Sequence, residues 1–262
     1  MLALTHCCWH PWKNLQIHWF IRRYGVNMQE AEQADINAYE NFNAFFTRSL
    51  RADARPIVPG TATLVAPVDG LVSEAGAVHN DSIIQAKGQS YSVGQLLASD
   101  QSLADVFTEG AFATLYLSPR DYHRVHMPCD GELQRMIHVP GRRFAVNPTS
   151  VAGIDHLFTR NERVISLFAT SAGSMALVMV GALFVGSIQT TWSDRLSARG
   201  HGEIQDYDYR NARISLAKGE EMGRFNMGST VILLFPAGRT QWHPIIQPGQ
   251  RLCLGEELGA IV

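Results

Sequence analysis

Residues 218–230 read KGEEMGRFNMGST and lead directly into the apolar run VILLF at 231–235. Short apolar runs broken by glycine and proline are typical of buried strands. Gly228 has no Cβ, so the backbone before Ser229 can bend until the serine hydroxyl faces the carbonyl carbon of its own peptide neighbour. The stretch therefore predicts a peptide bond, between Gly228 and Ser229, that the Ser229 side chain can attack.

Such an attack needs help, because an unassisted hydroxyl is a poor nucleophile at neutral pH and depends on a base that a third group orients. Two upstream segments supply these groups. Asp69 lies in APVDG (66–70), and His126 lies with His123 in YLSPRDYHRVHMP (116–128). The order Asp, His, Ser along the chain is uninformative, since triads are defined by their geometry.

The segment around the two histidines has the pattern of a helix start. Ser118 can cap the helix, Pro119 suits its first position and Asp121 completes a capping box, so we expect a short helix that ends near Pro128. On that helix the two histidines, three residues apart, would share one face and point into one cavity. Taken alone, their spacing is more typical of two surface histidines on a turn.

A metal site is the weaker interpretation of these histidines. The pattern H-x-x-H lacks a glutamate at the spacing of zinc hydrolases, and no cysteine or acidic partner lies at ligand distance in the sequence. We therefore expect acid/base chemistry and no metal. The other motifs also have ordinary alternatives, because Asp-Gly is often a tight hairpin turn and Gly-Ser-Thr is usually a loop.

Composition narrows the class of protein. The 262-residue chain can bury a substantial core, and its formal net charge of −2 with no Lys/Arg cluster argues against nucleic-acid binding. The N-terminal region lacks the pattern of a signal peptide, and the apolar run 175–185 is too short to span a bilayer. Four cysteines form no C-x-x-C pair or disulfide framework, so we expect free thiols in a reducing compartment. They are Cys7, Cys8, Cys129 and Cys253.

Residues 12–24 combine aromatic and apolar side chains with Lys13, Arg22 and Arg23, which predicts an aromatic and basic helix. At about 100° per residue its apolar positions form two patches. One contains Trp12, Leu15 and Trp19, and the other contains Ile17, Phe20, Ile21 and Tyr24. The helix can lie on a membrane surface, pack on the body by one patch, or do both, with the second patch offered to lipid headgroups, where Trp and Tyr are favoured.

The rest of the chain predicts a mainly β protein. A second helix is expected from Asn27, capped with Glu30 three residues later, and a third follows Asn41 with its phenylalanines facing inward. Short apolar runs then recur at 64–65, 71–72, 112–117, 136–139, 164–168, 175–185 and 231–235. The sequence therefore predicts an α+β fold, with N-terminal amphipathic helices over 1–55 and a catalytic body of barrel-like or sandwich-like antiparallel sheets over 56–262.

Several segments together resemble the bacterial phosphatidylserine decarboxylases, a pyruvoyl-dependent family. Besides the Gly-Ser-Thr run and the histidine segment, they are FNAFFTR (42–48), APVDG (66–70), AKG (86–88), FTRNERV (158–164) and VGSI (185–188). Only the extreme N-terminus and the tail lack a distinctive match. Met227 stands where the family usually has Leu, and both side chains are apolar and unbranched at Cβ, so the difference does not count against cleavage.

The resemblance implies a precursor that cuts itself between Gly228 and Ser229. The products would be a large chain, 1–228, and a small chain, 229–262, that stay together as a heterodimer and can dimerise further. Ser229 would become a covalent pyruvoyl group, which serves as the cofactor.

The same resemblance assigns Asp69, His126 and Ser229 to a charge-relay triad for this self-cleavage. The implied reaction is decarboxylation of phosphatidylserine to phosphatidylethanolamine and CO2 through a Schiff base with the pyruvoyl group. His123 would position the substrate or supply the proton. The implied location is peripheral, on the cytoplasmic face of the bacterial inner membrane, where phosphatidylserine is the partner.

Two other functions are considered: a pyruvoyl-dependent decarboxylase of a soluble amino acid, and a non-catalytic membrane-associated binding protein. The aromatic N-terminal helix favours a lipid substrate, and the complete set of triad residues with Gly228 favours an enzyme. The roles of Arg224 and Lys87 stay open, because each suits an anionic substrate group as well as a structural or solvated position.

Overall fold

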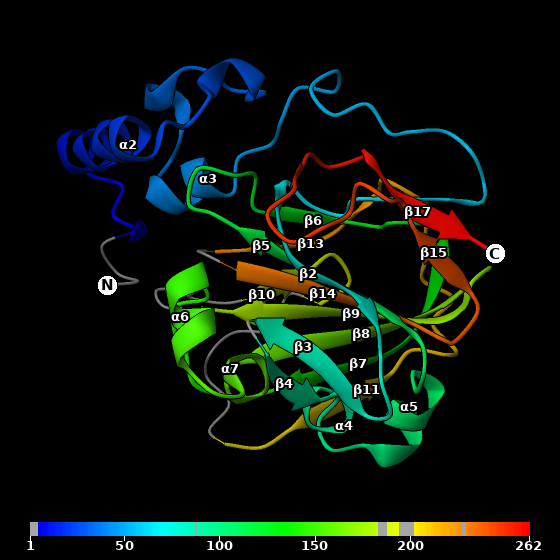
Figure 1. Cartoon of the computed structure of the whole chain (residues 1–262). Coiled ribbons are helices and arrows are strands. Elements are labelled where there is room, and N and C mark those ends of the chain that lie inside the picture. Colours follow the sequence, from blue (N-terminus) through cyan, green and yellow to red (C-terminus); the bar gives the residue numbers. More distant parts are fainter. Residues whose placement is uncertain (1–4, 87, 183–187, 194–201, 227–228) are drawn as a thin grey trace.

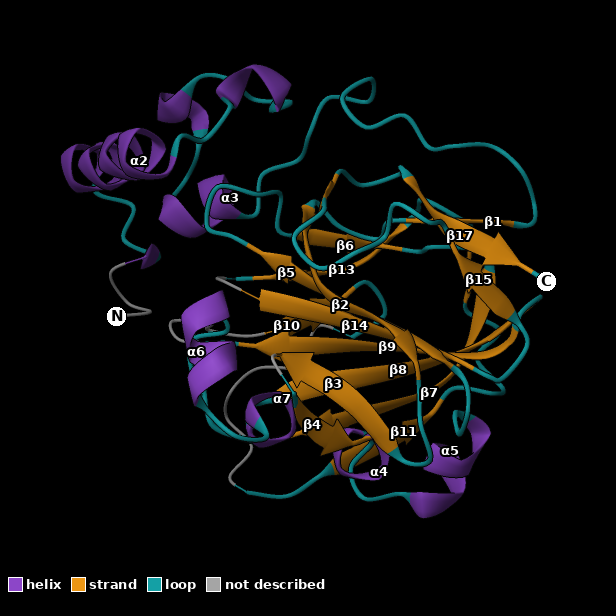
Figure 2. Cartoon of the chain, in the orientation of Figure 1, coloured by secondary structure: helices purple, strands orange, loops and turns teal. Residues whose placement is uncertain are grey.

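The computed structural model describes residues 5–86, 88–182, 188–193, 202–226 and 229–262. The described residues up to 55 form a helical segment, at the upper left in Figure 1, beside a larger β body. Strands dominate this body, and short helices lie at its edges (Figure 2). The arrangement confirms the predicted α+β class. In the described part of the chain the antiparallel sheets are open at their edges rather than closed into a barrel.

The helices fall into two groups along the chain. The helical segment contains α2 (His10–Tyr24), the 3₁₀ turns η1 (Met28–Glu30) and η2 (Ile36–Ala38), and α3 (Phe42–Phe46). The β body carries α4 (Val93–Leu96), α5 (Gln101–Val106), α6 (Pro148–Gly153) and α7 (Leu157–Arg160).

Helix α2 confirms the aromatic helix expected over 12–24. It ends at Gly25, whose φ of 69° and N–H bond to Ile21 O close the last turn in a left-handed conformation that suits glycine. Ile17 and Phe20 are buried, and the Phe20 ring meets three phenylalanine rings of α3 at centroid distances of 5.1, 6.0 and 5.8 Å. The predicted patch that contains Phe20 is therefore the one that packs inward.

Two asparagines begin the next elements, with different outcomes. Asn41 caps α3 by accepting a hydrogen bond from the backbone three residues later at 2.9 Å, and the phenylalanines of α3 are buried as predicted. Asn27 accepts from Gln29 N at 3.1 Å, but the expected second helix is only the single turn η1. It stops because Ala31 is extended and forms a β-bridge with Leu50.

Within the described residues the strands form one nine-stranded sheet and three smaller ones. The large sheet has the order β11 (Gln205–Asp208), β7 (Gly131–Val139), β8 (Arg163–Thr170), β9 (Gly173–Gly181), β14 (Ser229–Phe235), β5 (Ala111–Leu117), β2 (Gly70–Ala77) and β16 (Arg251–Leu252), and β12 (Ser215–Leu216) also pairs with β7. The smaller sheets are β1 (Thr63–Val65), β17 (Glu257–Ile261) and β15 (Thr240–Trp242); β10 (Ile188–Thr190), β13 (Glu221–Phe225) and β6 (Arg124–His126); and β3 (Ser82–Ala86) with β4 (Gln89–Ser92).

The predicted apolar runs all lie on these strands, apart from the end of 175–185. Strand β9 stops at Gly181, and residues 183–185 lie outside the described part of the chain. Short apolar runs broken by glycine, proline and polar residues therefore located β1, β2, β5, β7, β8, β9 and β14, but not the other strands.

Strand β14 lies between β5 and β9 and is buried along its whole length. Its first residue, Ser229, is opposite Leu117 of β5 on one side and Gly181 of β9 on the other. Because both edges of β14 are hydrogen-bonded, the sheet register fixes the position of Ser229.

The helix predicted from Ser118 to Pro128 is wrong. Asp121 Oδ2 accepts hydrogen bonds from the backbone N–H and the hydroxyl of Ser118 at 2.7 and 2.6 Å, which closes a turn, and the chain then enters β6. Strand β6 pairs with β13, and this pairing outweighs the local capping pattern. His123 precedes the strand and His126 is its last residue, so the two histidines do not share a helix face.

The Asp69-Gly70 pair is not a hairpin turn either. Gly70 is the first residue of β2, and a Cβ at this position would lie 2.6 Å from Tyr116 O on the neighbouring strand. Glycine is therefore needed where β2 and β5 approach each other. The consequence is that Asp69 stands at the entrance to a central strand.

Candidate active site

Ser229 has an enclosed side chain at the start of β14. The residue is 0% exposed, and its hydroxyl has no hydrogen-bond partner among the described residues. A buried hydroxyl without a partner costs roughly 1–3 kcal/mol, so its presence calls for a functional explanation. Gly228, the other half of the predicted cleavage site, lies outside the described residues.

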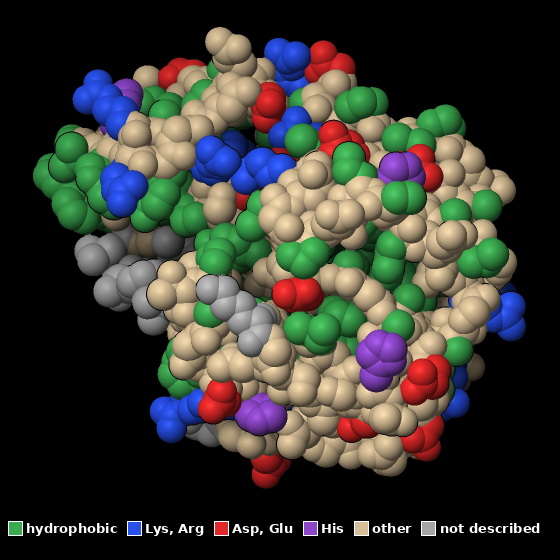
Figure 3. Space-filling view, in the orientation of Figure 1, with side chains coloured by type: hydrophobic (Ala, Val, Ile, Leu, Met, Phe, Trp, Pro, Cys, Tyr) green, Lys and Arg blue, Asp and Glu red, His purple; other side chains and the backbone are tan. Residues whose placement is uncertain are grey.

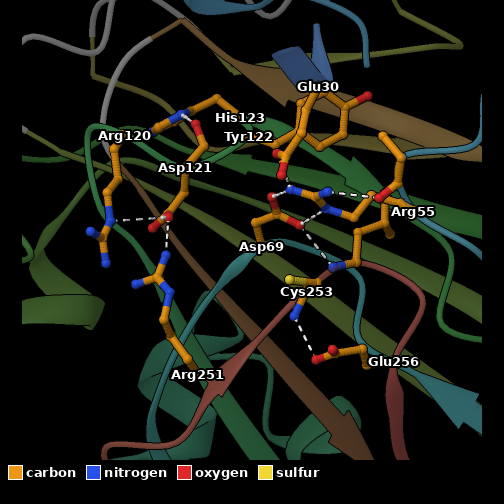
Figure 4. Close-up of polar contacts among 12 residues, drawn as sticks. Glu30, Arg55, Asp69, Arg120, Asp121, Tyr122, His123, Arg251, Cys253 and Glu256 are labelled. Carbon is orange, nitrogen blue, oxygen red and sulfur yellow. Dashed lines mark hydrogen bonds and ion pairs between the residues drawn. The ribbon is translucent and has the colours of Figure 1, made fainter. Parts of the chain in front are cut away.

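Asp69 is buried and held by two neighbours. Its Oδ1 accepts from Arg55 Nε and from Leu254 N, both at 2.8 Å, and its Oδ2 accepts from Arg55 Nη2 at 2.6 Å. Arg55 also donates to Glu30 of η1 at 2.8 Å, so one guanidinium connects the helical segment to Asp69 (Figure 4). These hydrogen bonds, above all the one with Asp69, raise the pKa of Arg55.

His123 is a neutral imidazole inside the protein. Its Nδ1 lies 2.8 Å from Asp121 O, and a carbonyl oxygen can only accept, so Nδ1 carries the proton and Nε2 is the free base. Nε2 is buried with no partner among the described residues. Burial lowers the pKa of His123 to about 3. The ring packs on Phe46 of α3 at a centroid distance of 4.1 Å.

His126 is less enclosed and has partners at both ring nitrogens. Its Nδ1 donates to Gly219 O at 2.8 Å, and its Nε2 accepts from the Tyr122 hydroxyl at 3.2 Å. Burial lowers the pKa of His126, while the charges of Glu221 and Asp69 act in the opposite direction. Burial also raises the pKa of Tyr122 to about 12, so this hydroxyl keeps its proton and is the donor.

The structure brings the predicted residues into one region without forming the full triad. His126 N donates to Pro67 O at 2.9 Å, which places this histidine beside the segment that carries Asp69. Phe225 N donates to His123 O at 2.9 Å, just before the chain reaches Ser229. Within the described residues the Asp69 carboxylate bonds to Arg55 and Leu254 rather than to His126. The triad contacts therefore stay a prediction, since catalytic hydrogen bonds often tighten only in the reacting complex.

The residues that surround Asp69 were not predicted from the sequence. Arg55 has no local signal, because its carboxylate partners lie 14 and 25 residues away in the chain. Tyr122 directly precedes His123 in the quoted segment, and its position beside two histidines was the one available signal.

The remaining sequence candidates have mixed outcomes. The cysteines are free, as expected. In the described ranges no group of three His, Cys, Asp or Glu side chains is arranged to hold a metal ion. Arg224 lies on β13 in register with Gln189 and Arg124, which does not decide its role, and Lys87 lies outside the described residues.

Known proteins match almost the whole chain. The family model described as phosphatidylserine decarboxylase matches residues 42–260. The chain belongs to the phosphatidylserine decarboxylase family. It is 50% identical to the phosphatidylserine decarboxylase proenzyme of Marinobacter nauticus over 250 residues, 95% of this chain and 87% of the relative. The proenzymes of Herminiimonas arsenicoxydans (50% over 246 residues; 94% and 83%) and Dechloromonas aromatica (50% over 244 residues; 93% and 86%) are similarly close.

The residues present fit the pyruvoyl group on which phosphatidylserine decarboxylases depend. Such a group is made from a serine, and Ser229 is a serine whose buried hydroxyl bonds to nothing in the described structure. The unpartnered Nε2 of His123 is a second buried polar atom in the same region.

The ion pair between Arg55 and Asp69 gives a stability prediction. Arg55→Met leaves the Asp69 carboxylate buried without its charged partner, which typically costs about 3–5 kcal/mol, so the thermal midpoint should fall sharply. Adding Asp69→Asn should restore part of the loss. Arg51→Met is the matched control, because it breaks an exposed pair with Asp53 and one exposed hydrogen bond to Gln29 O, and it should change the midpoint little. Equal losses in the two arginine variants would contradict this account.

Burial of His123 predicts an acid-sensitive fold. Its pKa is about 3 in the folded protein and returns to the ordinary value of roughly 6.5 on unfolding. Between these values the unfolded chain binds more protons, so the stabilisation is complete above about pH 6.5 and is lost as the pH falls. The thermal midpoint measured at about pH 5 should be lower than the midpoint measured at about pH 7. His123→Asn should reduce this difference. An unchanged pH dependence in the variant would show that His123 is not the group responsible.

Proposed function

We propose that Ser229 is the nucleophile of self-cleavage and the source of the pyruvoyl group. The observation that carries this proposal is its buried, unpartnered hydroxyl at the start of β14. The chain is a carboxy-lyase that converts phosphatidylserine to phosphatidylethanolamine and CO2, and it is made as a proenzyme. Membership of this family favours the lipid substrate over a soluble amino acid and an enzyme over a non-catalytic binding protein.

In the proposed maturation, His126, assisted by Asp69, takes the proton of the Ser229 hydroxyl. The oxygen adds to the carbonyl carbon of Gly228 and the bond to nitrogen breaks, so an ester replaces the amide. Loss of the Ser229 Cα proton then expels the Gly228 carboxylate by β-elimination. Addition of water to the unsaturated residue that remains, with release of ammonia, leaves the pyruvoyl group at the start of the chain 229–262.

The two histidines suit different steps. Burial lowers the pKa of His126, so its ring is neutral and can receive the serine proton, and the charges of Glu221 and Asp69 offset part of the cost of the imidazolium that forms. His123 is held neutral by burial and presents an unpartnered Nε2. We assign His123 to substrate positioning or to proton transfer at the substrate carbon.

Decarboxylation needs a group that accepts the electron pair left by departing CO2, and the pyruvoyl carbonyl supplies it. The protein contributes a site closed to water, because Ser229 and His123 are both fully buried. In such a site, charges and hydrogen bonds act more strongly than in solvent.

The proposed products, 1–228 and 229–262, would remain one body. The small chain supplies β14 to the middle of the large sheet, and it supplies β16 to pair with β2. Its β17 lies between β1 and β15 in a smaller sheet. Cleavage at Ser229 therefore cuts the backbone without separating the strands.

We also propose that the helical segment, 1–55, is the membrane-docking part and 56–262 the catalytic part. The buried apolar residues form two clusters, one within 17–46 and the other within 64–258, which supports this boundary. No described helix is long and apolar enough to cross a membrane.

The docking surface is the exposed side of α2. Trp9, Leu15 and Trp19 are 67%, 62% and 59% exposed, and Arg22 and Arg23 follow in the last turn. Figure 3 shows hydrophobic side chains gathered over α2 with basic side chains beside them. Exposed tryptophans beside arginines suit the interface of an anionic membrane, which supports a peripheral location on the cytoplasmic face of the bacterial inner membrane.

Self-cleavage is tested by the masses of the chains under denaturing conditions. Ser229→Ala should stay in one piece and be inactive, and His126→Ala should be cut roughly 10²–10⁴-fold more slowly. His123→Ala should still be cut but turn over poorly, and the exposed histidine variant His79→Ala should behave as wild type. A Ser229→Ala protein that is cut and active would overturn the proposal, and an uncut His123→Ala chain would move His123 into the cleavage step.

Membrane docking is tested by flotation with vesicles of phosphatidylserine and phosphatidylcholine. Replacing Trp9, Leu15 and Trp19 by serine removes the exposed apolar side chains of α2 and its N-cap. The affinity for vesicles, calculated from the bound fraction, should fall by about 10-fold or more. The control replaces Val106 and Ile245, exposed apolar residues of the β body, and should bind as wild type. Equal loss in both proteins would place docking elsewhere.

A further inference from the structure

Arg48, between α3 and the β body, lacks the hydrogen bonds that its burial requires. It is 4% exposed, yet its Nε and Nη1 have no partner among the described residues. Its Nη2 makes one long hydrogen bond, 3.4 Å, to Arg120 O, and the guanidinium carbon lies 5.5 Å from the centre of the Phe45 ring. Burial lowers the pKa of Arg48, but a guanidinium keeps its charge in proteins. A positive charge is thus enclosed without a direct counter-ion.

Arg163 shows how this protein satisfies a buried arginine with a structural role. It is equally enclosed, and its guanidinium donates four hydrogen bonds to backbone carbonyl oxygens at 2.7, 2.7, 3.2 and 2.7 Å. Arg48 has the same burial and only one long bond. Packing alone therefore does not account for its free N–H groups, which cost several kcal/mol if they stay unpaired.

Arg48 lines a cavity of about 250 Å³ between the helical segment and the β body, which we call the arginine cavity. The charged residues of its lining are Arg48, Arg55, Arg120, Arg251, Glu30, Asp69 and Asp121. Four arginines against three carboxylates leave one positive charge. Arg55 is paired with Glu30 and Asp69, and the other two arginines converge on Asp121 (Figure 4), so Arg48 is the one arginine of this lining that makes no ion pair with a described residue.

The arginine cavity lies next to the proposed chemistry and to the docking helix. Phe46, two residues before Arg48, packs on His123, and Tyr122 forms part of the cavity wall. Gly25, which ends α2, also lines the cavity. A ligand at Arg48 would therefore lie close to the end of α2 and to Tyr122, the neighbour of His123 in the chain.

A cavity with one surplus positive charge and free N–H groups fits a group with one negative charge. Phosphatidylserine offers a carboxylate and a phosphodiester. An arginine on the carboxylate would stabilise the charged ground state and oppose the loss of CO2, because only interactions that are stronger in the transition state accelerate a reaction. The phosphodiester keeps its charge throughout the reaction.

We propose that Arg48 binds the phosphodiester of the phospholipid headgroup and so fixes the serine end of the substrate beside His123. This inference rests on the proposed function and adds a specificity residue to it. It also explains how a lipid can be distinguished from free serine, which has the carboxylate and the amine but no phosphate.

The test measures headgroup binding apart from catalysis. Full-length Ser229→Ala protein, which forms no pyruvoyl group, is titrated calorimetrically with sn-glycero-3-phosphoethanolamine, with inorganic phosphate and with ethanolamine. We expect the glycerophosphodiester to bind, and Arg48→Met in the same background to weaken it roughly 10-fold to 100-fold. Arg48→Lys keeps the positive charge but loses the planar guanidinium that can donate two parallel hydrogen bonds, so it should weaken binding of the glycerophosphodiester less than Arg48→Met does. Ethanolamine should not distinguish the variants.

Two further measurements separate this role from a structural one. In the mature enzyme, Arg48→Met should raise KM for dihexanoyl phosphatidylserine by a similar factor while self-cleavage, followed by mass, proceeds as in wild type. Arg163→Met is the matched control, because it removes an equally buried arginine. It should lower the thermal midpoint without changing the affinity for the glycerophosphodiester.

The proposal is overturned if the Arg48-intact protein does not bind the glycerophosphodiester, or if both Arg48 variants bind it as tightly. Tighter binding of inorganic phosphate than of the glycerophosphodiester would make the cavity a site for free anions and would also overturn it. If Arg48→Met does not fold, Arg48→Lys decides by the same comparison. A Ser229→Ala chain that still cuts itself contradicts the proposed function but not the headgroup site. The mass of the chains measures self-cleavage, and calorimetry measures headgroup binding independently.

Discussion

The hydrogen bonding of β14 on both edges is the constraint on which the site depends. Strands β5 and β9 hold this strand from Ser229 onward, so the proposed nucleophile is placed by the register of the largest sheet rather than by a loop. Both faces of β14 are packed, so a slip of one residue would exchange the side chains that fill the two faces and place each in a space shaped for another. The same pairing explains how a chain can be severed at Ser229 and still keep its fold.

A second constraint is the guanidinium of Arg55, which joins three parts of the chain. It bonds to Glu30 in the helical segment and to Asp69 at the entrance to β2, and Asp69 in turn accepts from Leu254 in the proposed small chain. Buried ion pairs contribute little net stability, but they penalise arrangements in which one partner is left alone. The cluster therefore specifies how the helical segment and the two proposed products sit around Asp69.

Local patterns in the sequence predicted β1, β2, β5, β7, β8, β9 and β14 together with α2 and α3, and long-range pairing decided the other strands. The predicted apolar runs lie on strands, and Asn41 caps α3. Both features depend on residues that are close together in the sequence. The helix expected from Ser118 does not form, because residues 124–126 pair with β13 as strand β6. No local sequence pattern indicates this pairing. For the site, only the resemblance pointed to Asp69, His126 and Ser229, and their role as a triad stays a prediction. The ion pair between Arg55 and Asp69 could not be predicted, since it depends on the tertiary fold.

The proposed division into a docking part and a catalytic part matches the two separate apolar clusters. It does not separate the side chains around the candidate active site in the same way. Phe20 of α2 packs on Phe46 of α3 at 5.8 Å, and Phe46 packs on His123 at 4.1 Å, so a continuous path of aromatic contacts connects the docking helix to a buried histidine. Aromatic rings in such contacts restrict one another's positions. A displacement of α2 on the membrane would therefore be felt at His123. The proposed docking segment is thus in contact with the candidate active site, and its position is coupled to that of His123 through these rings.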